Sequence, residues 1–131
     1  MTGRPLFVPS PKAGNVLIAI GLCALGWGLY VRFMLVEASN VGLACQAGLP
    51  SAGCQVRAIT VALFDNNVFG AVALGAAVLH LIRPHVVLLG IALLAAGAGI
   101  VLYNTALSAF ALALLMLAFA RPAPVSDLQP E

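Results

Sequence analysis

Long apolar stretches separated by short polar interruptions make up most of the chain. Ala13–Val36, broken only by Asn15 and Arg32, is the first, and Val61–Ile82 is the second. Each is long enough for a helix to cross a hydrocarbon core of about 30 Å at about 1.5 Å per residue. The pattern therefore predicts two membrane-spanning helices, at 13–36 and 61–82.

The third apolar stretch, Val86–Ala120, contains neither a charge nor a proline. A single helix over this stretch would run about 50 Å, which is too long for a bilayer. We therefore expect it to fold back at Tyr103-Asn104-Thr105, giving helices at 86–103 and 105–120. These helices are short for a full crossing. The turn then lies at or below the membrane surface, where its backbone needs protein or water partners.

Composition supports a membrane protein. The chain is 63% apolar and 8% charged, with a mean hydropathy of +1.10, far from the balance of soluble proteins. The length allows one compact domain. We therefore predict an all-α fold, an integral membrane four-helix bundle. The net charge of +2 is too small and too scattered to indicate nucleic-acid binding.

The flanking charges predict the orientation. Four basic residues fall on one side of the predicted bundle: Arg4, Lys12, Arg83 and Arg121. The other side carries Arg32, Arg57, Glu37 and Asp65. The positive-inside rule then places both termini in the cytoplasm and residues 37–60 in an outer loop. The expected location is multi-pass in the cell inner (plasma) membrane.

The two chain ends lie outside the apolar stretches. Residues 1–12 contain Arg4, Lys12 and three prolines, which predicts a disordered basic tail. Residues 121–131 are expected to form a polar cytoplasmic tail. The basic start and the apolar run after it also fit a cleavable signal peptide, which is the alternative interpretation of the first helix.

Glycines recur every seven residues in two of the predicted helices. The series are Gly14, Gly21 and Gly28 in the first helix, and Gly90, Gly97 and then Asn104 in the third. Small residues at such spacing let membrane helices approach closely. We therefore expect the chain to contact a partner membrane protein, or further copies of itself in a homo-oligomer, in addition to the lipid bilayer. Chance spacing in a chain rich in glycine and alanine is the alternative.

Two cysteines lie in the predicted outer loop. Cys45 and Cys54 are separated by a turn-rich segment with Gly48, Pro50 and Gly53. Outside the cytoplasm such a pair is expected to be oxidised. The disulfide would be a structural staple or a redox-active pair, and free or metal-bound thiols are the remaining possibility. Cys23 lies in the middle of the first helix, where a thiol is usually a small apolar side chain.

A second group of polar residues borders the loop. Asp65 is expected near the outer boundary, where a charge must face protein or water. We expect an ion pair of Asp65 with Arg57 or Arg32 that anchors the loop. The alternative is a polar pocket for a lipid headgroup or a quinone carbonyl. The residues of this anchor or pocket are Arg32, Arg57, Asp65, Asn66, Tyr103 and Asn104.

Two histidines lie at the opposite boundary. His80 and His85 are five residues apart across Pro84, which is a poor spacing for chelation from one helix face. Contact with lipid headgroups is expected for both, and no metal site is predicted.

These features together resemble the four-helix family of vitamin K epoxide reductase and the bacterial disulfide-bond-formation protein B. The resemblance rests on the loop pair Cys45 and Cys54, the return through Asp-Asn-Asn-Val-Phe-Gly, and Leu-Tyr-Asn at the last corner. It implies transfer of electrons from the loop pair to a second pair in C-x-x-C spacing beside a quinone. This sequence has no C-x-x-C and carries Thr105-Ala-Leu-Ser108 at the corresponding place. Hydroxyls do not exchange with disulfides.

Three functions therefore follow as hypotheses. The first is a non-enzymatic accessory or assembly subunit of a membrane complex, with no cofactor and no catalytic residue. The second is a thiol-disulfide oxidoreductase that uses Cys45 and Cys54 with a quinone or a partner protein. The third is a small-molecule or lipid transporter that uses a pocket around Asp65, Tyr103 and Asn104.

Overall fold

The computed structural model describes residues 6–122, which form helices and no β-strand apart from an isolated bridge between Leu6 and Pro122. The expected all-α fold is confirmed. The helical elements are α1 (Pro11–Tyr30), the π-helical segment η1 (Val31–Val36), α2 (Ser39–Gln46), α3 (Ala52–Asp65), α4 (Val68–Ile82), α5 (Val86–Val101) and α6 (Thr105–Ala120).

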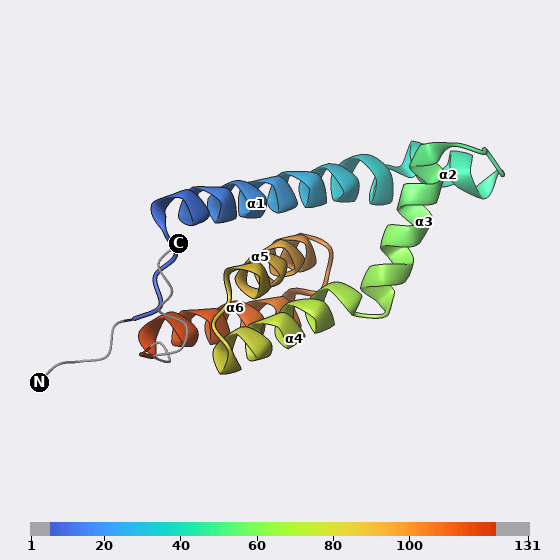
Figure 1. Cartoon of the computed structure of the whole chain (residues 1–131). Coiled ribbons are helices and arrows are strands. Elements are labelled where there is room, and N and C mark those ends of the chain that lie inside the picture. Colours follow the sequence, from blue (N-terminus) through green and yellow to red (C-terminus); the bar gives the residue numbers. More distant parts are fainter. Residues whose placement is uncertain (1–5, 123–131) are drawn as a thin grey trace, which may run out of the picture.

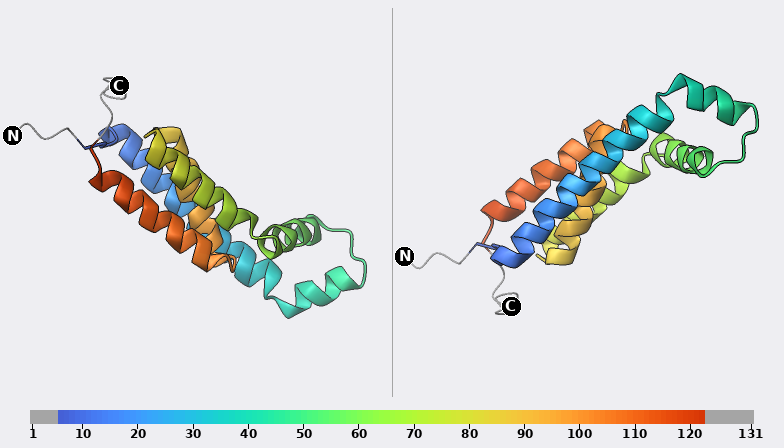
Figure 2. Two further views of the ribbon diagram at one scale, coloured as in Figure 1. Left: turned by 90° about the horizontal axis from the view of Figure 1, so that it is seen from below. Right: turned by 90° about the horizontal axis from the view of Figure 1, so that it is seen from above.

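Four of these helices lie side by side and are called the core helices here: α1, α4, α5 and α6 (Figures 1 and 2). α4, α5 and α6 pack against one another, whereas α1 packs chiefly on α5. Lys12, Arg83 and Arg121 all lie at the end where α1 begins and α4 and α6 end. This end is called the basic end, and the opposite end is the arm end.

Small residues allow the close approach of the core helices. On the α1–α5 interface, a Cβ at Gly28 would lie 3.2 Å from Val101 Cβ, and one at Gly97 would lie 3.4 Å from Ala24 Cβ. On the α4–α6 interface, a Cβ at Gly70 would lie only 2.6 Å from Leu107 Cβ. The predicted glycine series therefore contributes to packing at some positions. A Cβ at Gly14 or Gly21 would meet nothing within 4 Å.

Helices α2 and α3 form a hairpin that extends beyond the arm end of the core (Figure 1). It is called the arm here. The sequence predicts an outer loop at 37–60, and the structure places two helices there. The start of α3 is explained by its capping residue. Ser51 accepts a hydrogen bond from the Cys54 backbone N–H (3.2 Å), and such capping satisfies a donor that would otherwise have no partner in the helix.

The predicted helix at 61–82 is broken in the structure. α3 ends at Asp65, α4 begins at Val68, and the two helices are bent by 59°. Asn67 lies between them with φ 54°, in the left-handed region that asparagine tolerates better than most residues. The run Asp65-Asn66-Asn67 also consists of weak helix formers. The arm therefore leaves the core at this break.

One helix, Pro11–Val36, is by length and apolar composition able to cross a membrane. α3 and α4 meet the same criterion only when they are taken together across their bend. α5 and α6 are shorter apolar helices of 16 residues each. By these measures residues 6–122 contain one candidate span, or two if α3 and α4 are taken as one.

The predicted tails lie partly outside the described residues, since 1–5 and 123–131 are not described. α1 begins at Pro11, two residues earlier than predicted. Proline is compatible with the first helical turn, where its missing N–H costs nothing. Ser10 caps the helix, with its Oγ 3.3 Å from the Ala13 backbone N–H.

Candidate functional site

A disulfide closes the arm. Cys45 in the last turn of α2 and Cys54 in the first turn of α3 are bonded, with their Cα atoms 5.5 Å apart. Gly48, in the connection between the two helices, has φ 87° and so supplies a turn that few other residues would adopt. Both cysteines are half-buried. The predicted pair is therefore present as a disulfide, and it joins the end of α2 to the start of α3.

A charged cluster joins the base of the arm to the turn between α5 and α6. Arg32 Nε donates to Glu37 Oε1 (2.8 Å), and Arg32 Nη1 donates to the Val101 carbonyl (3.0 Å). The Tyr103 hydroxyl donates to the same Glu37 oxygen. The Arg32 guanidinium also lies 4.4 Å from the centre of the Tyr103 ring, a cation–π contact. The cluster links residues that are far apart in the sequence.

The π-helical segment η1 explains why Arg32 and Glu37 meet. The two residues are five apart, and in an α-helix only residues three or four apart are neighbours on one face. A π-helix bonds residue i to residue i+5, and the Glu37 N–H does bond to the Arg32 carbonyl (2.8 Å). Residues five apart are then one turn apart. Glu37 is a site residue that spacing rules for α-helices did not reveal.

The surroundings of Glu37 stabilise its charged form. The hydrogen bond from the Tyr103 hydroxyl, and then the bond from Arg32, lower the pKa of the Glu37 carboxyl below its usual value of 4.5. Hydrogen bonds and nearby positive charge both favour a carboxylate over the neutral acid. Glu37 is solvent-exposed, so the interaction is screened.

Asn104, at the start of α6, joins the arm to the core. Its side-chain amide Nδ2 donates to the Phe64 carbonyl (2.9 Å), and its Oδ1 accepts from the Gly70 backbone N–H (3.2 Å). The residue is 4% exposed. One side chain thus binds the end of α3 and the first turn of α4, on either side of the break. We call Asn104 with these two bonds the Asn104 clamp.

The remaining predicted site residues, Arg57, Asp65 and Asn66, lie on α3 or at its end. Among residues 6–122, Asp65 is exposed and forms no ion pair, so the predicted Arg–Asp partner is wrong: Arg32 pairs with Glu37 instead. The π-helical turn is the physical reason, because it places Glu37 nearer to the guanidinium. Asn66 Nδ2 donates to the Ala62 carbonyl (2.7 Å) at the end of α3.

Arg57 of α3 packs against α2 within the arm. Its guanidinium lies over Gly42 of α2, where an added Cβ would be 3.5 Å from Arg57 Nη2. Arg57 Nε is buried without a hydrogen-bond partner among the described residues. The contact holds α2 against α3, beside the disulfide.

His80 differs from its prediction. It is 1% exposed, lies in edge-to-face contact with Phe7, and its Nδ1 is 3.2 Å from the His85 backbone N–H. The expected contact of His80 with headgroups is therefore wrong. His80 instead packs inside the basic end and fixes the α4–α5 turn. Its position at the C-terminal end of an apolar helix gave no signal of this burial.

Comparison with protein-family models, with curated proteins and with solved structures finds no match to the chain. The Arg32–Glu37–Tyr103 cluster and the Asn104 clamp both lie where the arm joins the core. Each can hold the arm in one orientation, and the disulfide can hold the arm's two helices together.

Proposed function

We propose that the chain is a non-enzymatic, multi-pass protein of the cell inner membrane, in which the core helices form a four-helix transmembrane bundle. It acts as an accessory or assembly subunit of a larger membrane complex. In this proposal the arm lies outside and presents a fixed surface to the complex, while the basic end faces the cytoplasm.

The observation that carries the proposal is that the polar side chains at the base of the arm bond to the protein itself. Arg32, Glu37 and Tyr103 bond to one another, and Asn104 bonds backbone groups on both sides of the break. These groups therefore hold the arm in place. Of these groups Asn104 is buried, and both bonds of its amide are made, which favours a single arrangement of the arm and suits a structural subunit.

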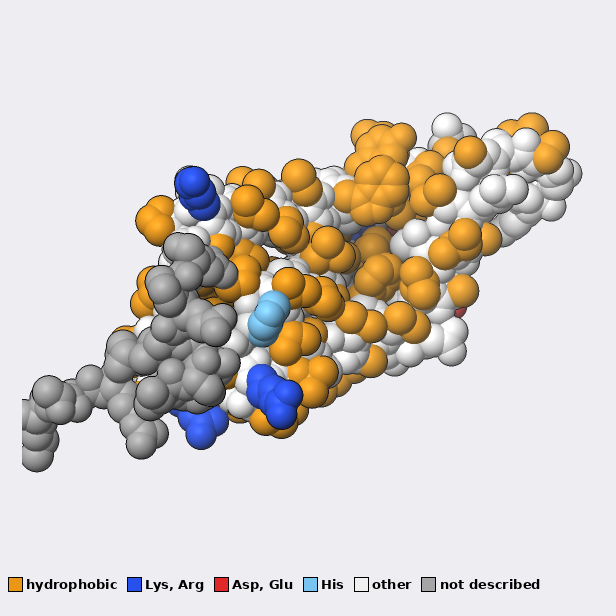
Figure 3. Space-filling model, in the orientation of Figure 1, with side chains coloured by type: hydrophobic (Ala, Val, Ile, Leu, Met, Phe, Trp, Pro, Cys, Tyr) orange, Lys and Arg blue, Asp and Glu red, His pale blue; other side chains and the backbone are white. Residues whose placement is uncertain are grey.

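The distribution of side chains supports membrane insertion. Figure 3 shows hydrophobic side chains spread over the core, with Lys and Arg side chains gathered toward the basic end. Trp27, Tyr30 and Phe33 are exposed toward the arm end, and Trp and Tyr favour the membrane–water interface. Lys12 and Trp27 are separated by about 22 Å of helix rise. Helices α5 and α6 rise about 24 Å each, which a modest local thinning of the bilayer accommodates.

The exposed face of α1 supplies a contact surface for the complex. Ile18 and Leu22 are each more than half exposed, and the glycines beside them, Gly14 and Gly21, have open space where a Cβ would lie. Open glycines allow another helix to approach closely. The partner helix is thus expected along this face.

The test uses Gly21→Leu, with Gly75→Leu as its control. Both sites are helical glycines with nothing within 4 Å of an added Cβ, so both variants are expected to fold. Wild type and Gly75→Leu should be recovered from native membranes in mild detergent in an assembly larger than the monomer. Gly21→Leu should lose most of it. A wild-type protein that is a lone monomer, or an assembly unchanged in Gly21→Leu, contradicts the proposal.

A second candidate function is a thiol-disulfide oxidoreductase coupled to a quinone or to a partner's thiols. The observation that favours it is the half-buried disulfide on the arm, which a partner thiolate could reach. In this case Cys45→Ser or Cys54→Ser removes the activity while the core stays folded. A disulfide that is never reduced during turnover excludes it.

A further inference from the structure

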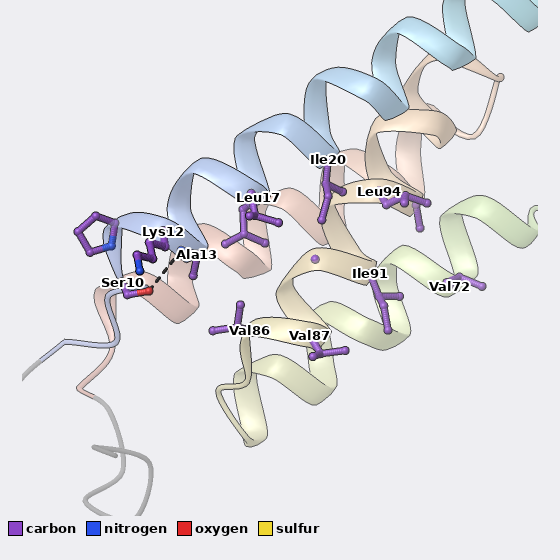
Figure 4. A pocket seen from close by; sticks show the side chains of 14 residues that line it. Ser10, Lys12, Ala13, Leu17, Ile20, Val72, Val86, Val87, Ile91 and Leu94 are labelled. Carbon is purple, nitrogen blue, oxygen red and sulfur yellow. Dashed lines mark hydrogen bonds between the residues drawn. The ribbon is translucent and has the colours of Figure 1, made fainter. Parts of the chain in front are cut away.

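A deep apolar groove runs between α1 and α5. Its volume is about 1020 Å³. Its walls include Leu17 and Ile20 of α1, whose side chains point toward α5 in Figure 4, together with Ile91 and Leu94 of α5. Val72 of α4 closes one side. The groove exists because α1 packs chiefly on α5 while α4, α5 and α6 pack together, so α1 leaves one flank unfilled.

The groove continues toward the arm end. A second cavity of about 550 Å³ shares Val16, Ile20 and Leu94 with the first and extends to Trp27 and Phe69. Every residue of this second cavity is apolar or a cysteine. The two cavities together therefore form a continuous apolar surface that a hydrocarbon chain can occupy.

Polar groups lie at one end of the groove only. Among its lining residues, Ser10 and Lys12 are the polar side chains, and both are at the start of α1 (Figure 4). Lys12 is exposed, and Arg83 and Arg121 lie at the same end of the core. A ligand that matches this surface has a hydrocarbon body and a negatively charged head.

We propose that the groove binds one anionic phospholipid of the inner leaflet, with an acyl chain between α1 and α5 and its phosphate near Lys12. This inference rests on the membrane placement in the proposed function. The first cavity extends along α1 from Lys12 to Ile20, about 12 Å of helix rise. One leaflet is about half of a 30 Å hydrocarbon core. The depth therefore matches a chain that enters from one leaflet.

The occupant is a lipid because of the shape of its site. Leu17 and Ala95, both less than 8% exposed, form part of the lining, so the groove reaches the core. The groove is open along one side, its lining is apolar, and its polar side chains lie at one end only, which suits an acyl chain with a charged head. A partner helix would instead meet the outward face of α1, as proposed above.

Gly90→Leu tests the site, with Gly75→Leu as the matched control. A Cβ at Gly90 would make ordinary contacts with Leu17 Cδ2 at 3.6 Å and Ile20 Cδ1 at 4.0 Å, so a leucine at this position would occupy space between α1 and α5 in the groove. Gly75 lies on α4 outside the lining and has open space. Both substitutions remove a helical glycine, so their effects on helix propensity match.

The measurement is the lipid retained by the purified protein in mild detergent, by native mass spectrometry, after adding phosphatidylglycerol or phosphatidylcholine. Wild type and Gly75→Leu should retain one phosphatidylglycerol in preference to phosphatidylcholine, and Gly90→Leu should retain neither. Lys12→Gln should lower the affinity for phosphatidylglycerol about fivefold, as expected for one basic residue near a charged surface. Arg83→Gln, at the same end but outside the lining, should have a smaller effect.

Three results overturn the lipid site. They are equal retention in Gly90→Leu and Gly75→Leu, equal retention of the two lipids by wild type, and recovery of a neutral isoprenoid or of a second copy of the chain in the groove. Assembly in native membranes is measured separately with Gly21→Leu. A failed lipid test with intact assembly therefore removes this inference and leaves the proposed function standing.

Discussion

At the scale of single residues, the arm depends on a few polar side chains that each make more than one contact. Asn104 is the clearest case, because one buried amide satisfies a carbonyl on α3 and an N–H on α4. A buried backbone group that loses its partner costs about 1–3 kcal/mol. The effect of each such residue can be measured against a similar residue that is exposed.

Asn104→Ala should destabilise the protein by about 1–3 kcal/mol, since it leaves the Gly70 N–H without its side-chain acceptor, whereas the Phe64 carbonyl keeps its bond from the Asn67 N–H. Asn66→Ala is the control, because Asn66 is exposed and makes one local bond; it should change stability by about 0.5 kcal/mol or less. Unfolding in detergent, followed by circular dichroism, gives both values. Equal losses in the two variants would contradict the role of Asn104.

The Glu37 carboxylate predicts a pH dependence. Its pKa is lowered in the folded protein by the Tyr103 hydroxyl and by Arg32, so the folded state binds this proton less readily than the unfolded state. The stabilisation is therefore complete above the usual pKa of 4.5 and is lost as the pH falls through the lower folded value.

Glu37→Gln removes this proton-dependent stabilisation. Wild type should lose more thermal stability than Glu37→Gln between pH 6 and pH 3, and the melting temperature of each should be measured across that range. Parallel curves for the two proteins would show that the cluster does not stabilise the fold.

At the scale of elements, the sequence predicted the first, third and fourth apolar helices closely, but it missed the break at Asp65–Asn67 in the second and the helices of the arm. The turn at Arg83-Pro84-His85 and the turn at Tyr103 follow from proline, charge and polarity, and α5 and α6 begin and end within a few residues of their predicted bounds. Helices α2 and α3 were missed because glycine and proline around the cysteines favour turns. The pairing of Arg32 with Glu37 was missed because it depends on a π-helical turn, which has no simple sequence pattern.

Close packing of α4 on α6 predicts a large difference between two glycine substitutions. Gly70→Ala places a Cβ 2.6 Å from Leu107 Cβ, and overpacking of this kind typically costs about 1–3 kcal/mol. Gly75→Ala, on the same helix with open space around it, should be neutral or stabilise by up to about 1 kcal/mol. Thermal unfolding of both variants measures the difference. A Gly70→Ala protein as stable as Gly75→Ala would show that α4 and α6 are not this close.

The disulfide should stabilise the arm and leave the core nearly unchanged. Its cysteines are nine residues apart in sequence, and closing a loop of that size is worth about 2–3 kcal/mol in the chain-entropy description. Cys45→Ser with Cys54→Ser should therefore raise hydrogen exchange in α2 and in the first turns of α3. Exchange in α5 and α6 should stay as in wild type. Faster exchange throughout the core would show that the disulfide stabilises the whole fold.

At the scale of the whole molecule, four packed helices carry an arm at one end and basic side chains at the other. The basic end, the aromatic side chains toward the arm end and the apolar core between them support one orientation. The lipid groove and the open face of α1 lie on different sides of the same helix. One helix could thus contact a lipid and a partner at once.

The most direct test of this account is thiol labelling in intact cells with a membrane-impermeant maleimide of high mass, on a Cys23→Ser background. Cys45 and Cys54 should resist labelling until a reductant is added, and should then be labelled from outside without permeabilising the membrane. Adding a quinone analogue or depleting oxidant should not change this. Labelling that needs permeabilised cells would contradict the orientation. If a fraction of Cys45 and Cys54 is reduced and this fraction changes with the quinone, the protein is a thiol-disulfide oxidoreductase and the structural role of the arm is wrong.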